Sequence, residues 1–123
     1  MKILVIDSSA EFRSLFKKLF WDPNNNNELI EAANYDDGID ILDTERPDLI
    51  IIDIFRSTSP DYSILIRFQE YLHHSVIIVF SLGLLPFQVE KVKSFGIEYV
   101  FDKWSESGKL LRLVKGGLSS NIK

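Results

Sequence analysis

Five short blocks rich in aliphatic residues recur along the chain, and a segment with helical spacing separates each block from the next. The blocks span residues 2–6, 28–33, 48–52, 75–80 and 97–101. The clearest helical segment, residues 12–20, places Phe and Leu at positions i, i+3, i+4, i+7 and i+8, which form one apolar stripe on a helix. Parallel strands need long crossovers, which usually contain a helix. The sequence therefore predicts an α/β domain with a doubly wound, five-stranded parallel sheet and helices on both faces.

The size and composition of the chain exclude several classes of protein. The chain has 123 residues, enough for one domain, and its 46% hydrophobic and 26% charged residues are typical of a globular protein. The longest aliphatic runs, residues 49–52 and 76–80, are far shorter than the roughly 20 apolar residues that span a bilayer, so we expect no membrane segment. A net charge of -4 argues against direct nucleic-acid binding. The absence of cysteine fits a reducing compartment, so we expect a cytoplasmic protein.

Side chains suited to a cation or a phosphoryl group follow four of the predicted strands. Asp7, Asp53 and Ser81 come directly after their strands, and Lys103 follows the last strand through Asp102. In the strand order 2-1-3-4-5, Asp7 and Asp53 emerge at the switch point where open parallel sheets bind ligands. Neighbouring carboxylates repel each other, so such a site needs a bound cation, a lysine partner or a raised pKa on one of the acids. Mg²⁺, which prefers oxygen ligands, is the natural cation. An aspartate can also form an aspartyl phosphate, whose oxygens a hydroxyl and an ammonium would stabilise.

Five segments form a specific pattern when they are taken together and in order. They read KILVID, EAANYDDGIDIL, RPDLIIID, VIIVFS and FGIEYVFDK. In these segments the sequence closely resembles the response-regulator receiver domains of two-component signalling, over essentially the whole chain. The resemblance implies a flavodoxin-like receiver fold with strand order 2-1-3-4-5. Residues 1–118 would form the receiver domain and residues 119–123 a C-terminal tail.

The resemblance also implies a role for each residue of the predicted site. Asp53 would be the phosphoacceptor of a phosphorelay, and the carboxylates of Asp7 and Asp53 with the backbone carbonyl of Phe55 would bind Mg²⁺. Ser81 and Lys103 would contact the phosphoryl group. A sensor histidine kinase or a phosphotransfer protein would supply that group, and the chain itself would be a signalling phosphoprotein and not an enzyme.

One member of the family's acidic pair is replaced in this chain. Ser8 stands where the family has its second acid, and it begins the sequence S-S-A-E, which predicts a capping box with Glu11. A capping carboxylate is already engaged, so we favour the cap over Glu11 as a replacement metal ligand. With two carboxylates facing one lysine, we expect weak Mg²⁺ binding and a Lys103 that pairs with Asp53 alone.

Three further departures surround the predicted pocket. The family's Met-Pro turn after the phosphoacceptor is absent, so we expect a different loop at residues 54–61. Leu82 stands where the family has a small residue and would cover the pocket. Trp104 replaces the family's proline after the lysine. Because a cis bond before a non-proline residue costs roughly 3 to 4 kcal/mol, we expect a trans bond and a somewhat displaced Lys103.

The predicted output surface is altered as well. Val100 stands where family members often carry an aromatic switch residue, and Tyr99 and Phe101 flank it. Alternation along a strand directs these two side chains to the face opposite Val100, where packing is favoured over a shifted switch. Residues 86–123 carry a charge of +3 and residues 1–85 a charge of -7. The basic excess fits two interpretations equally well: solvated helix faces, or a surface made by the fourth helix, fifth strand and fifth helix that docks an acidic downstream protein or a second copy of the chain.

Several functions remain open at this point. A working receiver is favoured by the presence of Asp7, Asp53, Ser81 and Lys103. A pseudo-receiver that binds proteins without phosphorylation is favoured by Ser8, Leu82, Trp104 and the missing Met-Pro turn. A hydrolase with an aspartyl nucleophile lacks a second acid close behind Asp53. A flavin-binding protein of the same architecture would need a phosphate-cradling loop after the first strand, which is absent.

Overall fold

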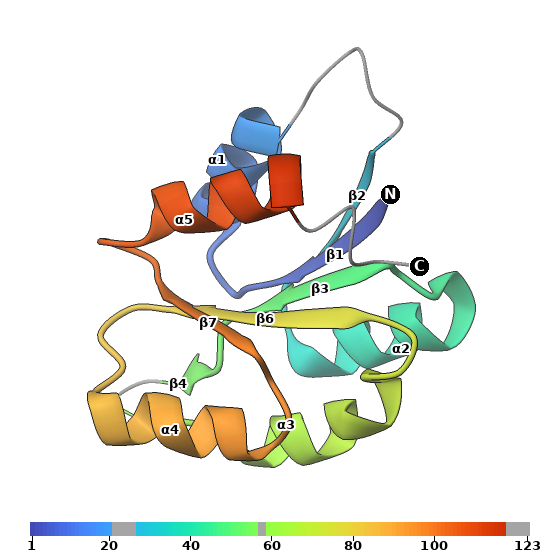
Figure 1. The fold of residues 1–123 in the computed structure, drawn as a ribbon. Helices are drawn as coiled ribbons and strands as arrows, with labels where there is room; N and C mark the ends of the chain where they lie inside the picture. The colour runs from blue at the N-terminus through green and yellow to red at the C-terminus, as the bar shows by residue number, and fades with distance from the viewer. Residues whose placement is uncertain (21–26, 57–58, 118–123) are drawn as a thin grey trace.

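The central element of the computed structural model, which describes residues 1–20, 27–56 and 59–117, is a five-stranded parallel sheet. Its strands are β1 (Lys2–Ile6), β2 (Glu28–Ala32), β3 (Leu49–Ile52), β6 (Val76–Ser81) and β7 (Tyr99–Asp102). They run in the order β2-β1-β3-β6-β7, and every pair is parallel (Figure 1). Since β6 and β7 are the fourth and fifth strands of this sheet, the predicted fold class and strand order are confirmed.

Helices cover both faces of the sheet (Figure 1). One face carries α1 (Ala10–Phe20) and α5 (Ser107–Arg112), which continues into a π-helical turn at Leu113–Gly117. The other face carries α2 (Tyr35–Glu45), α3 (Ser63–Phe68) with the 3₁₀ turn Gln69–Tyr71, and α4 (Pro86–Ser94). This arrangement explains why the central strands are continuous aliphatic runs and not alternating patterns, because a strand buried on both faces needs apolar side chains at every position.

Side-chain alternation divides the core into two clusters. In β1, Ile3 and Val5 pack with α1 and α5, whereas Leu4 and Ile6 pack on the side of α2 and α3. The same alternation in the edge strand β7 places Tyr99 and Phe101 on one face and Val100 on the other, which confirms the predicted directions of these side chains. The two aromatic rings stack with their centroids 6.4 Å apart.

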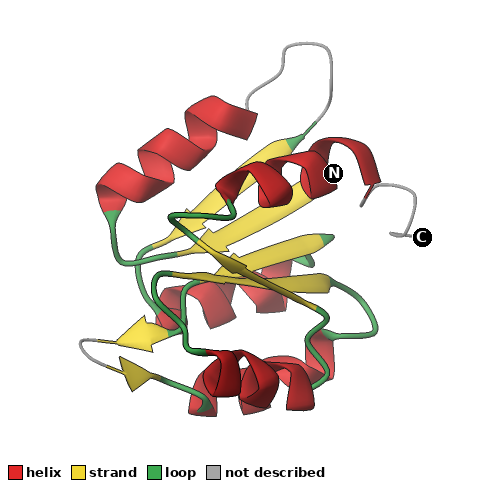
Figure 2. Cartoon of the chain, turned by 60° about the vertical axis from the view of Figure 1, so that its left-hand side comes forward, coloured by secondary structure: helices red, strands yellow, loops and turns green. Residues whose placement is uncertain are grey.

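A short antiparallel hairpin follows β3, in the loop that we expected to differ from the family. Its strands are β4 (Phe55–Arg56) and β5 (Ser59–Pro60), and it lies at the carboxyl end of the sheet (Figure 2). The base of the hairpin is closed by a hydrogen bond of 2.7 Å from the Asp61 amide to the Ile54 carbonyl, and Ile54 is buried. The hairpin therefore forms one side of the edge at which the predicted site lies.

Two predictions concern the chain as a whole. No helix in residues 1–20, 27–56 or 59–117 is long and apolar enough to cross a membrane. The predicted domain end at residue 118 and the tail at residues 119–123 lie outside the described residues.

Candidate functional site

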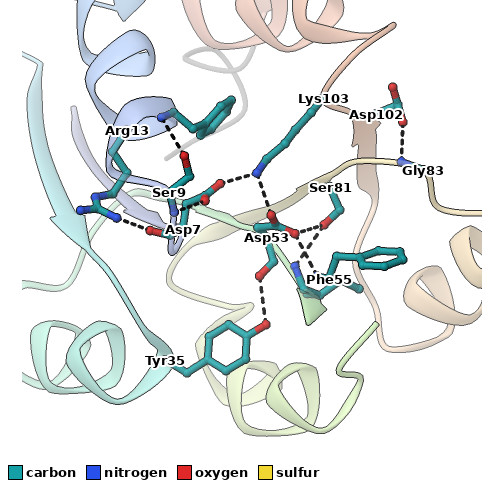
Figure 3. A network of polar contacts seen from close by, with 12 residues as sticks. Asp7, Ser9, Arg13, Tyr35, Asp53, Phe55, Ser81, Gly83, Asp102 and Lys103 are labelled. Atoms are coloured by element: carbon teal, nitrogen blue, oxygen red, sulfur yellow. Dashed lines mark hydrogen bonds and ion pairs between the residues drawn. The ribbon is translucent and has the colours of Figure 1, made fainter. Parts of the chain in front are cut away.

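The four predicted side chains lie together at the carboxyl edge of the sheet (Figure 3). Asp7 and Asp53 come directly after β1 and β3, Ser81 is the last residue of β6, and Lys103 follows β7. The Lys103 Nζ lies 2.6 Å from Asp7 Oδ2 and 2.7 Å from Asp53 Oδ2. One ammonium therefore bridges the two carboxylates across adjacent strands.

The carboxylate of Asp53 is held by several donors. The Ser81 hydroxyl donates to Asp53 Oδ1 over 2.8 Å, and the Phe55 amide donates to the same oxygen over 2.9 Å. Ser81 is fully buried, and its Oγ accepts a hydrogen bond of 3.0 Å from the Ile54 amide. The Tyr35 hydroxyl donates to the backbone carbonyl of Asp53 over 2.9 Å. Both the side chain and the backbone of Asp53 are thus fixed before any ligand arrives.

Asp7 is the more buried of the two acids, with 3% of its side chain exposed against 17% for Asp53. Its Oδ1 accepts a hydrogen bond of 2.9 Å from the Ser9 amide. Its backbone carbonyl accepts from the Arg13 guanidinium, which also lies 3.2 Å from Glu31. Because so little solvent reaches this carboxylate, the Lys103 ammonium and the Ser9 amide replace water in stabilising its negative charge.

Lys103 carries the positive charge of the site. Burial lowers the pKa of its ammonium, but hydrogen bonds and charges from Asp53 and Asp7 outweigh burial, so the pKa is raised above its usual value. One expectation for this residue is wrong: Lys103 pairs with both acids and not with Asp53 alone. The described residues contain no cis peptide bond, so the bond to Trp104 is trans as predicted. The long, flexible side chain of Lys103 lets its ammonium reach both carboxylates.

The helix cap after β1 differs from the prediction by one residue. Ser9, and not Ser8, caps α1, because its Oγ accepts a hydrogen bond of 3.0 Å from the Phe12 amide. The sequence S-S-A-E offers two serines, and α1 begins at Ala10, which selects the second. The predicted capping box of Ser8 with Glu11 is therefore wrong. Ser8 is exposed and lines the pocket beside Asp7.

A pocket of about 260 Å³ opens beside the two acids. Its lining consists of Ile6, Asp7, Ser8, Ala33, Asn34, Tyr35, Asp53 and Phe55. Leu82 is not in this lining and is 55% exposed, so it does not cover the pocket as predicted.

The donor set at this pocket fits a divalent cation only in part. The carboxylates of Asp7 and Asp53 are the hard oxygen ligands that Mg²⁺ prefers, and Phe55 also lines the pocket. However, Lys103 already pairs with an oxygen of each acid, so a cation would compete with the ammonium. Among the residues that the structure describes, no three acidic or histidine side chains come together in a metal-binding group. Weak Mg²⁺ binding stays a prediction.

The sequence analysis did not predict that the Asp102 side chain links two loops at the carboxyl edge of the sheet. Its carboxylate accepts a hydrogen bond of 2.9 Å from the amide of Gly83 (Figure 3). It also accepts from the amides of Trp104 at 2.9 Å and Ser105 at 2.8 Å. The amides of Gly83 and Ser105 are the main reason that the pKa of Asp102 lies below its usual range. Asp102 thus joins the loop after β6 to the turn that carries Lys103. An aspartate at a strand end, followed by a turn, is the signal that predicts such a contact.

Comparison with known proteins identifies the fold. No family model matches the chain, and no curated protein matches it in sequence. The signal receiver domain of a DNA-binding response regulator (merR) from Colwellia psychrerythraea 34H is 23% identical, with a TM-score of 0.79 over 97% of this chain and 98% of that chain. The chemotaxis protein CheY4 of Vibrio cholerae is 18% identical, with a TM-score of 0.76 over 99% of this chain and 98% of that chain.

The chain has the receiver-domain fold of response regulators. A third structure with this fold, the Mn(2+)-bound form of response regulator Rcp1, is 16% identical, with a TM-score of 0.76 over 99% of this chain and 94% of that chain. At such identities the likeness concerns the fold. The chemistry of this receiver-like domain has to be argued from its own residues.

Proposed function

We propose that this chain is a receiver in phosphorelay signal transduction, which accepts a phosphoryl group on Asp53 and signals by binding another protein. The observation that carries the proposal is the Lys103 ammonium, which pairs with both Asp7 and Asp53. The Ser81 hydroxyl donates to the carboxylate of Asp53. These groups come from four separate strands. A purely structural ion pair would need neither the second acid nor the buried hydroxyl.

The proposed reaction is a phosphoryl transfer from a phosphohistidine of a sensor histidine kinase or phosphotransfer protein. An oxygen of Asp53 forms a bond to phosphorus while the phosphorus–nitrogen bond breaks, and the imidazole nitrogen keeps the electron pair and takes up a proton. Lys103 and the Ser81 hydroxyl would then donate hydrogen bonds to the new phosphoryl oxygens. The chain positions Asp53 for the transfer and supplies the positive charge of Lys103, and it is not itself an enzyme.

Charge explains why this receiver would react slowly. The pocket holds two carboxylates against one ammonium, and phosphorylation adds a group whose charge approaches −2. A weakly held Mg²⁺, bound by Asp7, Asp53 and the Phe55 carbonyl, would reduce this charge when present. Ser8 contributes no carboxylate to that site, so we expect a higher Mg²⁺ requirement than a site with three acids would have.

The partner surface is proposed to consist of α4, β7 and α5. Val100 and its neighbours Tyr99 and Phe101 lie in β7, and they would report the state of the pocket to a downstream protein or to a second copy of the chain. Several lysines lie on this part of the molecule, so an acidic partner fits it best. We place this activity in the cytoplasm, where histidine kinases act.

Phosphorylation by a small donor tests the proposal. The purified chain is incubated with acetyl phosphate over a series of Mg²⁺ concentrations and analysed by intact mass. We expect one phosphoryl adduct that is lost in Asp53→Asn and kept in Asp40→Asn, a matched change at an exposed residue of α2. We expect Ser8→Asp to form the adduct faster and at less Mg²⁺.

The second candidate is a pseudo-receiver that binds proteins without phosphorylation. It is favoured by the ammonium of Lys103, which occupies both acids and leaves the pocket stable without a metal. An adduct that forms in Ser8→Asp but at no Mg²⁺ concentration in the unmodified chain would select this candidate. An adduct that persists in Asp53→Asn would contradict both.

A further inference from the structure

The aromatic ring of Phe12 lies against the ammonium of the site. Lys103 Nζ is 4.3 Å from the centre of the Phe12 ring, well within the roughly 6 Å over which a ring face attracts a cation. The side chain of Lys103 is 16% exposed, so solvent screens this attraction only in part. The ammonium therefore has three neighbours that favour it: the carboxylates of Asp7 and Asp53, and the face of an aromatic ring.

Packing fixes the position of that ring. Phe12 belongs to the first turn of α1, and its ring centre lies 5.5 Å from that of Phe80 on β6 and 6.2 Å from that of Phe16 on α1. Phe16 and Phe80 are buried in the cluster between the sheet and the α1–α5 layer. A ring held on two sides in this way stays in place when the lysine moves.

Four residues form a closed cycle of contacts around the end of β1. Asp7 Oδ1 accepts from the Ser9 amide at 2.9 Å, and Ser9 Oγ accepts from the Phe12 amide at 3.0 Å. The Phe12 ring contacts the Lys103 ammonium, which donates to Asp7 Oδ2 at 2.6 Å. The helix cap, the acid, the ring and the lysine thus restrain one another. Ser8 stands next to this cycle but takes no part in these contacts.

The charge of the pocket gives the ring its significance. Ser8 supplies no carboxylate, and among the described residues the acids that pair with the ammonium are Asp7 and Asp53. The face of an aromatic ring is the negative part of its quadrupole, so Phe12 adds its attraction to that of these two carboxylates. An apolar aliphatic residue at position 12 would fill the same space without that attraction.

We propose that Phe12 is a positioning residue for Lys103, whose ring face holds the ammonium at the phosphoacceptor. Its effect on phosphorylation rests on the proposed function, whereas its effect on the order of Lys103 does not. A lysine side chain has several rotatable bonds, and holding it in place before the reaction removes an entropic cost from phosphoryl transfer. The ring would therefore raise the rate without touching the phosphoryl group.

Two substitutions at position 12 separate attraction by the ring from packing. Phe12→Leu removes the ring and keeps an apolar side chain, whereas Phe12→Tyr keeps a ring of similar electronic character. Pentafluorophenylalanine incorporated at position 12 keeps the shape of phenylalanine, but its fluorines withdraw electron density from the ring face. Phe95→Leu is the matched control, because Phe95 is also a half-buried phenylalanine but packs against the core cluster on the opposite face of the sheet.

Each protein is measured in two ways. Proton–nitrogen NMR observes the Lys103 ammonium, whose protons exchange slowly with water only while they are held. Intact mass gives the rate of phosphorylation by acetyl phosphate at saturating Mg²⁺. For Phe12→Leu and the fluorinated protein we expect a lost or broadened ammonium signal and a rate about 3- to 10-fold lower. Phe12→Tyr and Phe95→Leu should keep the signal and stay within about 2-fold of the unmodified rate.

The outcomes distinguish the two proposals. If the fluorinated protein keeps the ammonium signal and only Phe12→Leu loses it, Phe12 acts by packing and the inference is wrong. If Phe95→Leu loses the signal as Phe12→Leu does, the effect is a general loosening of the domain and the inference is again wrong. If the unmodified chain forms no adduct, the proposed function fails, but the ammonium signals still decide the role of Phe12.

Discussion

Replacing Lys103 by methionine should destabilise the chain strongly, because it leaves two acids without their shared cation. Methionine keeps an unbranched apolar stem of similar length, so the change removes mainly the charge. The side chain of Asp7 is only 3% exposed and lies 2.6 Å from the lysine nitrogen. Asp53, at 17% exposed, keeps its hydrogen bonds from Ser81 and the Phe55 amide but loses the same ammonium.

The expected magnitude follows from burial. Removing one partner of a buried ion pair lowers the free energy of unfolding by roughly 3–5 kcal/mol, because the remaining charge is left uncompensated. We expect the lower end, about 3 kcal/mol, since Lys103 and Asp53 each keep some contact with solvent. For a domain of this size that corresponds to a fall in Tm of about 10 °C.

Urea unfolding at neutral pH, followed by far-ultraviolet circular dichroism, measures this loss. The double variant Asp7→Asn with Lys103→Met removes the more buried negative charge as well, so it should recover at least about half of the lost unfolding free energy. Two results would refute the reasoning. One is a loss in Lys103→Met below about 0.5 kcal/mol, and the other is a double variant no more stable than Lys103→Met alone.

Three further predictions concern residues around the site and the core. Ser9→Ala should lower the unfolding free energy by about 1 kcal/mol through loss of the helix cap, whereas Ser8→Ala should change it by less than about 0.5 kcal/mol; equal effects in urea unfolding would contradict the cap at Ser9. Because the pKa of Asp102 is lowered in the folded chain, its stabilisation is present above its unfolded pKa and is lost as the pH falls through the folded value. The stability difference between the unmodified chain and Asp102→Asn should therefore shrink below about pH 4, and a constant difference down to about pH 2 would be contrary evidence. The buried Ser75 hydroxyl donates to the Pro47 carbonyl over 2.6 Å. Ser75→Ala should thus cost about 1–2 kcal/mol in thermal or urea unfolding, and an unchanged midpoint would argue against that bond.

The architecture was predictable because it depends on repeated, short-range features. Aliphatic blocks of strand length alternate with helical segments along the whole chain, and the handedness of crossovers leaves few topologies for such a pattern. Parallel strands that end at one edge also bring their following residues together, so the sequence predicts Asp7, Asp53 and Ser81 near Lys103. The roles of these residues in phosphoryl transfer remain predictions.

The errors in the sequence analysis share a physical cause. Ser8 and Ser9 are equally good caps by type, and only the start of α1 at Ala10 selects between them. Leu82 was expected over the pocket because of its size, but the loop after β6 leaves it exposed. Lys103 was expected to pair with one acid, whereas its flexible side chain reaches both. In each case the local sequence was compatible with more than one side-chain arrangement, and contacts with neighbouring elements decided between them.

The amino-acid sequence by itself determined the five strands of the parallel sheet, the helices between them and their order, and it indicated that Asp7, Asp53, Ser81 and Lys103 meet at the carboxyl edge. Periodicity and connection length are encoded locally, so these features need no knowledge of distant contacts. Only the tertiary structure decided which atoms pair there: the ammonium shared by Asp7 and Asp53, the ring of Phe12 behind it, and the carboxylate of Asp102 that joins two loops. Such contacts depend on side-chain rotamers and on the distances between segments far apart in sequence, where a difference of a few tenths of an ångström matters. Packing of the whole domain sets both.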